Sequence, residues 1–179
     1  MIFKIFFYYA LHLFGFKSNI PIWTDKHRQQ FRVWPHLIDY NLHLNNAKYL
    51  YLFEKSRINF AIALRWSDLM VKNKISYAVA ASEISFIKEL PLFKTFTIET
   101  SIAGWNTKYL YLNQKIMINS NIYAVSYFKI AFVQKGKIFN TSSLFSLLNL
   151  DAKEEKKHPL IEPWNELSKS KQHMKKTIS

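Results

Sequence analysis

The pattern of apolar and polar residues changes sharply between two adjacent segments of the chain. Over residues 29–34 the two kinds alternate, with Phe31 and Val33 on one face, which predicts a short strand ended by Pro35. Over residues 47–64 apolar residues dominate, which predicts one helix. Asn45 or Asn46 is expected to cap this helix, because a short amide side chain can accept from its first free N–H groups.

The predicted helix is apolar on nearly every side, so we expect it to be buried nearly all round. Glu54 and Arg57 are the exceptions; they lie three residues apart and are expected to form a buried pair. The core stripe is predicted to consist of Leu50, Phe53, Ile58, Ala61 and Ile62.

Strand-like segments fill most of the chain after a polar link at residues 67–74. The predicted strands cover residues 76–90, 95–103, 109–119 and 122–134, with a short edge strand at 137–139. Consecutive strands joined by short turns favour antiparallel pairing. The order of elements therefore predicts an α+β domain, in which one antiparallel sheet curls around a single buried helix.

Length and composition fit one globular domain and exclude several functions. The chain has 179 residues, of which 49% are hydrophobic. It has only three glycines, which excludes a GxGxxG fingerprint and a P-loop. It has no cysteine, so disulfides, thiolate metal sites and a cysteine nucleophile are excluded. This usage is compatible with a reducing cytosol, and we expect a cytoplasmic protein.

The net charge of +13 predicts attraction to anionic partners such as phosphates or an acidic membrane surface. A background bias toward Lys, Asn and Ile explains the charge equally well. The sequence has no Arg-rich helix and no RNP-like aromatic motif, so we expect no nucleic-acid partner.

The two ends differ from the middle, which divides the chain into residues 1–20, 21–145 and 146–179. Residues 1–16 are almost wholly apolar but shorter than a bilayer-spanning helix. They are expected to lie in a membrane interface, or to pack on the domain or on a second subunit. Residues 146–179 are rich in charge and are predicted to form a mostly mobile tail.

The candidate chemistry lies just before the predicted helix, where Asp39, Asn41 and His43 occupy alternate positions. Helix starts present unpaired N–H groups and a positive dipole to whatever binds there. The imidazole of His43 could act as a base near neutral pH. His36 and His43 are seven residues apart with no acidic pair bracketing them, so we expect no metal and no cofactor.

This plan resembles the hotdog-fold thioesterase superfamily. The resemblance is carried by Arg32-Val33-Trp34-Pro35, by the run from Asp39 through Asn41, His43, Asn45 and Asn46 to Leu50, and by Glu54 and Arg57. It covers roughly residues 28–140. It is closest to the acyl-CoA thioesterase-like group that includes the membrane-associated thioesterase superfamily members, and the motif is also similar to that of plant acyl-carrier-protein thioesterases.

The resemblance implies a hotdog domain, paired as a homodimer or a dimer of dimers, with acyl sites at the subunit interface. It places Asp39, Asn41 and His43 in the active site. It adds a downstream carboxylate, for which Glu89 is the first candidate and Glu83 the second. The related group often has an acidic residue two positions before Asp39, where this chain has Leu37.

The resulting hypothesis is an enzyme that hydrolyses acyl-CoA or acyl-carrier protein. Asp39 would orient His43 or water, or attack directly, while Asn41 and the N–H groups after Asn45 polarise the carbonyl. Asn45, Asn46 and Tyr49 are candidates for substrate contact.

Structural roles stay open beside the catalytic ones. Asp39 could make an Asx-turn, His43 could be a hydrogen-bonded core residue, Tyr49 could belong to the core, and Asn45 and Asn46 could serve as caps. Two other functions are weighed, a non-catalytic lipid-binding or scaffold protein of the same fold and, less favoured, a hydroxyacyl dehydratase.

Overall fold

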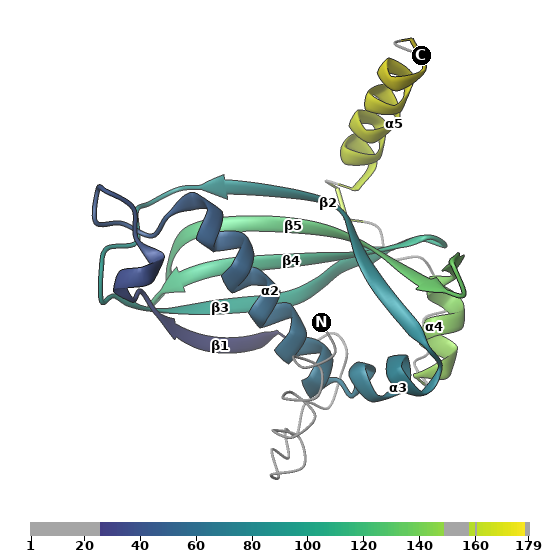
Figure 1. Ribbon diagram of the computed structural model, residues 1–179, viewed down its shortest axis with the longest axis horizontal. Helices are drawn as coiled ribbons and strands as arrows, with labels where there is room; N and C mark the ends of the chain where they lie inside the picture. The colour runs from purple at the N-terminus through teal and green to yellow at the C-terminus, as the bar shows by residue number, and fades with distance from the viewer. Residues whose placement is uncertain (1–25, 149–157, 160, 178–179) are drawn as a thin grey trace.

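A curled antiparallel sheet wraps around one long helix in the computed structural model, which describes residues 26–148, 158–159 and 161–177 (Figure 1). The sheet has the order β1-β3-β4-β5-β2, with β6 paired to β5. Its strands are β1 (His27–Arg32), β2 (Ile75–Phe86), β3 (Thr95–Trp105), β4 (Tyr109–Ile118), β5 (Asn121–Gln134) and β6 (Lys137–Phe139). The predicted α+β architecture is confirmed, and each predicted strand is present.

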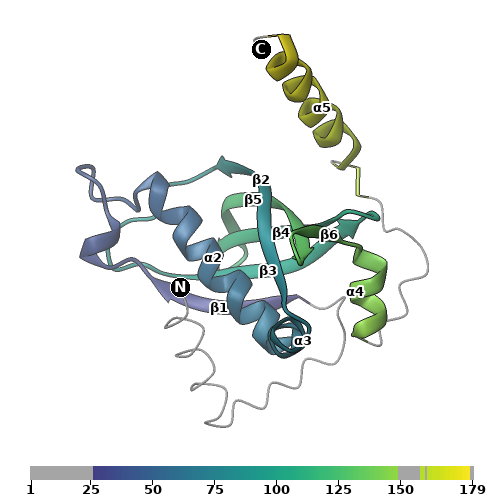
Figure 2. The ribbon, with the colours of Figure 1, turned by 45° about the vertical axis from the view of Figure 1, so that its right-hand side comes forward.

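The central helix α2 (Asn46–Ala63) lies across the concave face of the sheet (Figures 1 and 2). Asn45 is its N-cap, and its side-chain oxygen accepts from the backbone N–H of Ala47 at 2.8 Å. The predicted cap is thus confirmed at the first of the two asparagines. Asn46 begins the helix and is exposed.

The buried face of α2 differs from the predicted stripe. The side chains that pack on the sheet are Tyr49, Leu52, Phe53, Ser56, Arg57 and Phe60. Leu50, predicted to be core, is 45% exposed, and Tyr51 beside it is also exposed. The expectation of burial nearly all round is therefore wrong, because the sheet covers only one side of the helix in the described chain.

A buried polar network fastens α2 to the centre of the sheet. Gln114 of β4 accepts from Arg57 Nη1 at 3.0 Å and donates to Thr100 Oγ1 at 2.8 Å. It also donates to the backbone oxygen of Phe53 at 3.2 Å. Ser56 Oγ lies 2.9 Å from Thr100 Oγ1. These bonds satisfy most of the polar groups beneath the helix, which would otherwise be costly to bury, while Arg57 Nε has no hydrogen-bond partner among the described residues.

Arg57 does not form the predicted pair with Glu54. Its side chain turns into the core, where only 7% of the residue is exposed, while Glu54 remains exposed. Its guanidinium carbon lies 3.8 Å from the ring centroid of Phe128, and no described carboxylate is within salt-bridge distance. Burial lowers the pKa of Arg57 to about 10. The guanidinium is therefore a buried cation held by an amide and an aromatic face.

The segment predicted to be a polar link contains a helix, α3 (Trp66–Lys72). Trp66 and Met70 are one turn apart and buried, so a short apolar edge closes the open end of the core. Residue 65 adopts φ 58°, which redirects the chain between α2 and α3. A second short helix, α4 (Thr141–Leu147), covers the same end of the sheet (Figure 1).

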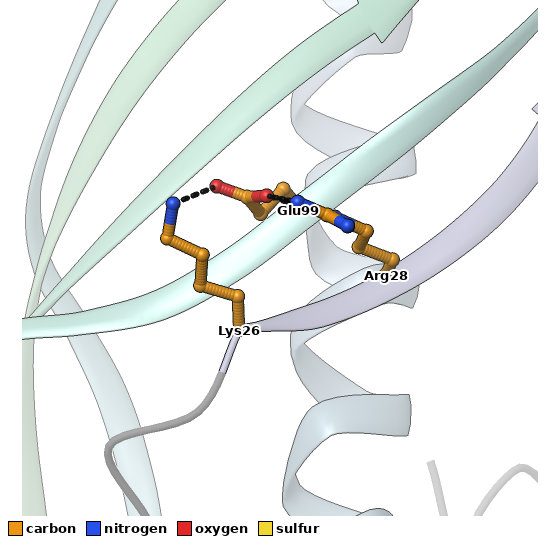
Figure 3. A network of polar contacts seen from close by, with 3 residues as sticks. All are labelled: Lys26, Arg28 and Glu99. Carbon is orange, nitrogen blue, oxygen red and sulfur yellow. Dashed lines mark hydrogen bonds and ion pairs between the residues drawn. The ribbon is translucent and has the colours of Figure 1, made fainter. Parts of the chain in front are cut away.

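An acidic side chain on β3 joins the edge strand β1 to the sheet (Figure 3). Glu99 accepts from Arg28 Nε at 2.9 Å and lies 3.2 Å from Lys26 Nζ. Burial raises the pKa of Glu99, but the hydrogen bonds and charges of Arg28 and Lys26 outweigh burial and leave it below its usual value. Glu99 is therefore ionised at neutral pH and helps to hold β1 in register.

The C-terminal segment predicted to be mostly mobile contains helix α5 (Ile161–Thr177). Ile161 is buried in a cluster with Ala103 and Tyr111. Asn165 Oδ1 accepts from Tyr111 Oη at 2.9 Å and from Lys129 Nζ at 2.6 Å. The first turns of α5 therefore contact the sheet, and the rest projects away from it (Figure 1).

The apolar segment at residues 1–16 lies outside the described residues, so its predicted membrane contact stays a prediction. No helix in the described ranges is long and apolar enough to cross a membrane.

The polar network predicts that Gln114→Leu destabilises the protein by about 3 kcal/mol. This change preserves volume but removes the acceptor of a buried guanidinium. The free energy of unfolding, measured by urea titration at constant slope, checks it. Replacing the cation as well, in the double variant Arg57→Met with Gln114→Leu, should recover most of the loss. A change of less than about 0.5 kcal/mol for Gln114→Leu would contradict the assigned role.

Candidate active site

The loop before α2 folds back on itself as a tight, hydrogen-bonded turn. The backbone N–H of Asp39 donates to the carbonyl oxygen of His43 at 2.9 Å. One carboxylate oxygen of Asp39 accepts from the backbone N–H of Asn41 at 2.9 Å, which makes the Asx-turn considered above. Leu42 adopts φ 62° to close the turn. The alternating polar residues are thus brought to one end of the helix.

Backbone pairing attaches this turn to the segment between β2 and β3. Leu44 N donates to Leu90 O at 2.8 Å, and Leu92 N donates to Leu42 O at 3.2 Å. His43 and Pro91 form an isolated antiparallel bridge. Residues nearly fifty positions apart therefore lie side by side, and Glu89 is carried to the imidazole.

The structure places the carboxylate of Glu89 next to His43. Glu89 Oε2 lies 3.3 Å from His43 Nδ1. The His43 side chain is 33% exposed and that of Glu89 is 75% exposed, so the pair faces solvent. Of the two candidate carboxylates Glu89 is therefore the one at the imidazole. Glu83 lies within β2, opposite Tyr127, and accepts a hydrogen bond from Ser85.

Tyr49 borders this cluster from inside the core. Its ring is 2% exposed and packs edge-on against Phe86, with 4.8 Å between the ring centroids. Burial raises the pKa of Tyr49 to about 12, and the negative charges of Glu89 and Asp39 add to the shift. The phenol is therefore protonated at neutral pH and available as a hydrogen-bond donor.

The start of α2 supplies one backbone donor at the same end. Ala47 N–H is taken by the Asn45 side chain, and Lys48 N–H by the Asn45 carbonyl. Asn46 N–H has no partner among the described residues. The helix dipole adds a positive potential at this point.

The predicted residues are thus gathered unequally. His43 and Glu89 are in contact, Asp39 is bonded to His43 through the backbone of the same turn, and Asn45 and Asn46 form the adjacent helix start. The charges of Glu89 and Asp39 add to the rise in the pKa of Tyr49 in the first turn of α2. Asn41 is exposed, and its backbone rather than its side chain makes the recorded contact. Sequence reasoning did not foresee that burial, together with the charges of Glu89 and Asp39, raises the pKa of Tyr49. No local spacing signals this coupling, because Glu89 is brought to the start of α2 by pairing between distant segments.

The position of Leu37 explains the departure from the acidic pattern. Its side chain is buried in the main core, and its backbone oxygen accepts from Asn45 N at 2.9 Å. It therefore supports the turn, and the carboxylate that lies at His43 is that of Glu89.

The fold and this site define a class of protein. The family model of the thioesterase-like superfamily matches residues 33–164, and the chain belongs to that superfamily. Its curled antiparallel sheet around one helix is the hotdog fold, as predicted.

Two curated relatives match part of the chain. Protein THEM6 of Danio rerio is 33% identical over 92 residues, which cover 50% of this chain and 45% of the relative. Protein THEM6 of Drosophila melanogaster is 30% identical over 80 residues, covering 44% and 41%. The match thus spans less than half the length of either relative.

Solved structures share the fold at low sequence identity. YbaW, a probable thioesterase from Escherichia coli, has a TM-score of 0.64 at 21% identity, covering 68% of this chain and 95% of its own. SAV2348 from Staphylococcus aureus, solved in complex with CoA, has a TM-score of 0.63 at 16% sequence identity. The match covers 72% of this chain and 84% of that structure. Slr0204, a 1,4-dihydroxy-2-naphthoyl-CoA thioesterase from Synechocystis, has a TM-score of 0.60 at 7% sequence identity. The match covers 73% of this chain and 99% of that structure.

The two carboxylates should each influence the ionisation of Tyr49. Glu89→Gln and Asp39→Asn remove negative charges and should lower its pKa from about 12, but not to the usual ~10, because burial is the larger cause. Titration of the tyrosine Cζ resonances by NMR, with Tyr49→Phe for assignment, measures this. Glu83→Gln is the matched control and should leave the titration unchanged. Equal titration of Tyr49 in all three carboxylate variants would disprove the proximity.

Proposed function

We propose that the protein hydrolyses acyl-CoA thioesters at the cluster of Asp39, His43, Glu89 and Tyr49. The observation that carries the proposal is the contact of 3.3 Å between His43 Nδ1 and Glu89 Oε2 at the start of α2. An imidazole oriented by a carboxylate, beside free donors, is the arrangement that activates water next to a carbonyl.

Membership of the thioesterase-like superfamily supports thioester hydrolysis in general. CoA as the carrier is suggested by structural neighbours, because SAV2348 was solved with CoA and Slr0204 is a CoA thioesterase. Acyl-carrier protein is the alternative carrier, and the two are separated by the assay below.

The proposed role of His43 is that of general base. With Nδ1 held by Glu89, the opposite nitrogen Nε2 is left to take a proton from water. The carboxylate of Asp39 keeps one oxygen outside its Asx-turn, and this oxygen would position the water and stabilise the imidazolium.

The developing oxyanion would be stabilised by donors at the start of α2. Asn46 N–H is the free backbone donor there, and the phenol of Tyr49 is a second candidate. Water adds to the thioester carbonyl, the C–S bond breaks, and the proton held by His43 passes to the departing thiolate. The products are a carboxylic acid and free CoA.

The mechanism predicts that His43→Ala lowers kcat for an acyl-CoA by about 10²–10⁴-fold, because the general base is lost. Asp39→Ala should cause a loss of similar size. Glu89→Gln should lower kcat only about tenfold, since the carboxylate is exposed to solvent and is proposed to orient the imidazole rather than to bind the attacking water. Release of free thiol across a panel of acyl-CoA and acyl-carrier-protein substrates measures these rates.

Glu83→Gln is the matched control for Glu89→Gln and should retain the wild-type rate. If the folded protein turns over no thioester in the panel, hydrolysis is excluded. The alternative, a non-catalytic lipid-binding or scaffold protein, then predicts bound lipid in native mass spectrometry that survives Asp39→Ala. The buried Leu37 in place of an acidic residue is what favours that alternative.

We further propose that the protein is a homodimer formed through β2. This strand is one edge of the sheet, and its backbone groups on that side are unpaired among the described residues. Apolar side chains along it are exposed, namely Tyr77, Val79, Phe86 and the adjacent Ile87. An exposed apolar edge is open to pairing with another strand, and a twofold axis would pair β2 with its own copy in antiparallel fashion.

Val79→Lys should therefore convert the dimer to a monomer, because like charges would meet across the twofold axis. Val71 on α3 provides a matched control, being 51% exposed where Val79 is 42% exposed. Val71→Lys should leave the dimer intact. Light scattering after size-exclusion chromatography reports the mass, and a dimeric Val79→Lys protein would rule out this edge.

A further inference from the structure

A groove of about 420 Å³ lies between β1, the 3-10 turn η1 (Pro35–Leu37) and one flank of α2. Apolar side chains of Phe31, Leu37 and Leu52 line it, and the latter two are buried. The lining also contains aromatic or basic side chains, namely Arg32, Trp34, His36, Tyr51 and Lys55, together with Gln30 and Thr95. The proposed hydrolysis uses none of these side chains.

Each exposed ring of the groove has a cation beside it. Arg32 Nε donates to the backbone oxygen of Phe93 at 2.9 Å, and its guanidinium carbon lies 5.3 Å from the ring centroid of Trp34. Lys55 Nζ lies 4.5 Å from the ring centroid of Tyr51. The groove therefore contains two pairs of an aromatic ring and a cation.

All the charged side chains that line the groove are basic. Its lining includes Arg32, Lys55 and His36 but no Asp or Glu. Neither Arg32 nor Lys55 has a carboxylate within salt-bridge distance in the described part of the chain. These cations are therefore free to meet an anion from solution, and the concave shape would concentrate their field.

This combination selects a nucleotide over a simple anion. A phosphate alone needs cations but gains nothing from Trp34 or Tyr51. A nucleobase stacks on aromatic rings, and its phosphates pair with Arg and Lys. A membrane surface would instead favour protruding cations, whereas these line a recess.

The groove adjoins the candidate active site. Leu37 lines the groove and also accepts the hydrogen bond from Asn45 N that sets the start of α2. Asp39 follows two residues later. Leu37 therefore connects the groove with the helix start, and a ligand that used both sites would have to extend from one to the other.

We propose that this groove binds the adenosine bisphosphate end of coenzyme A. The inference rests on the proposed function and names the carrier, because acyl-carrier protein presents the same pantetheine arm without a nucleotide. Trp34 and Tyr51 take the base, and Arg32 and Lys55 take the phosphates.

Direct binding tests the groove without any turnover. Calorimetric titration of the whole protein with adenosine 3′,5′-bisphosphate should show saturable binding, weakened about tenfold in Trp34→Ala and in Lys55→Gln. Lys72→Gln removes an exposed lysine on α3 and should leave the affinity unchanged. Equal affinity of wild type and groove variants would overturn the assignment. Inorganic pyrophosphate binding as tightly as the nucleotide would overturn the aromatic part of the site.

Kinetics separates the groove from the chemistry. Trp34→Ala and Lys55→Gln should raise KM for acyl-CoA about tenfold with kcat unchanged. KM for the matching acyl-pantetheine, which lacks the nucleotide, should not move. An equal rise in KM for both substrates would show that the groove shapes the active site instead. Nucleotide binding with no turnover would sink the hydrolase proposal and leave the groove standing.

Discussion

The structure depends on the burial of Arg57 against Gln114, which fixes one position of α2 on the sheet. Apolar side chains alone would allow the helix to slide or rotate, because dispersion and hydrophobic contacts are not directional. A buried guanidinium tolerates few positions, since losing its acceptor leaves a charge without a partner in the core. Thr100 and Ser56 extend the same network and tie two strands and one helix to a common register.

The fixed helix determines where the candidate chemistry lies. Once α2 is placed, Asn45 and Tyr49 at its first turns have set positions, and the turn at Asp39 to His43 must close onto residues 90–92. Burial in the apolar core beneath the helix start raises the pKa of Tyr49 to about 12. The same placement turns Tyr51 and Lys55 outward, where they face Arg32 and Trp34 across the groove.

Much of the fold could be predicted because local patterns agree with the final arrangement. Alternation over the strands, turn residues between them and the Asn45 cap are all short-range signals, and each is present as expected. The errors share a different cause. The pairing of Arg57 with Glu54, the core position of Leu50 and the polar link at α3 were read from helix spacing and hydropathy alone. The true arrangement at each of these positions depends on which side of the helix the sheet covers. One signal was present, since Gln114 interrupts the apolar series of Leu110, Leu112 and Ile116 on the inner face of β4.

The sequence by itself determined the element order, the helix start and the polar residues assembled there, because caps, turns and periodicities are local properties of the backbone. It limited the candidates for the downstream carboxylate to Glu89 and Glu83. Only the tertiary structure shows that Glu89 rather than Glu83 lies beside His43, since this contact depends on backbone pairing between segments far apart in the chain. Tertiary packing also decided the role of Leu37 and the existence of the basic aromatic groove, whose walls come from three separate elements. Such long-range contacts follow from the packing of the helix on the sheet, which no local pattern encodes.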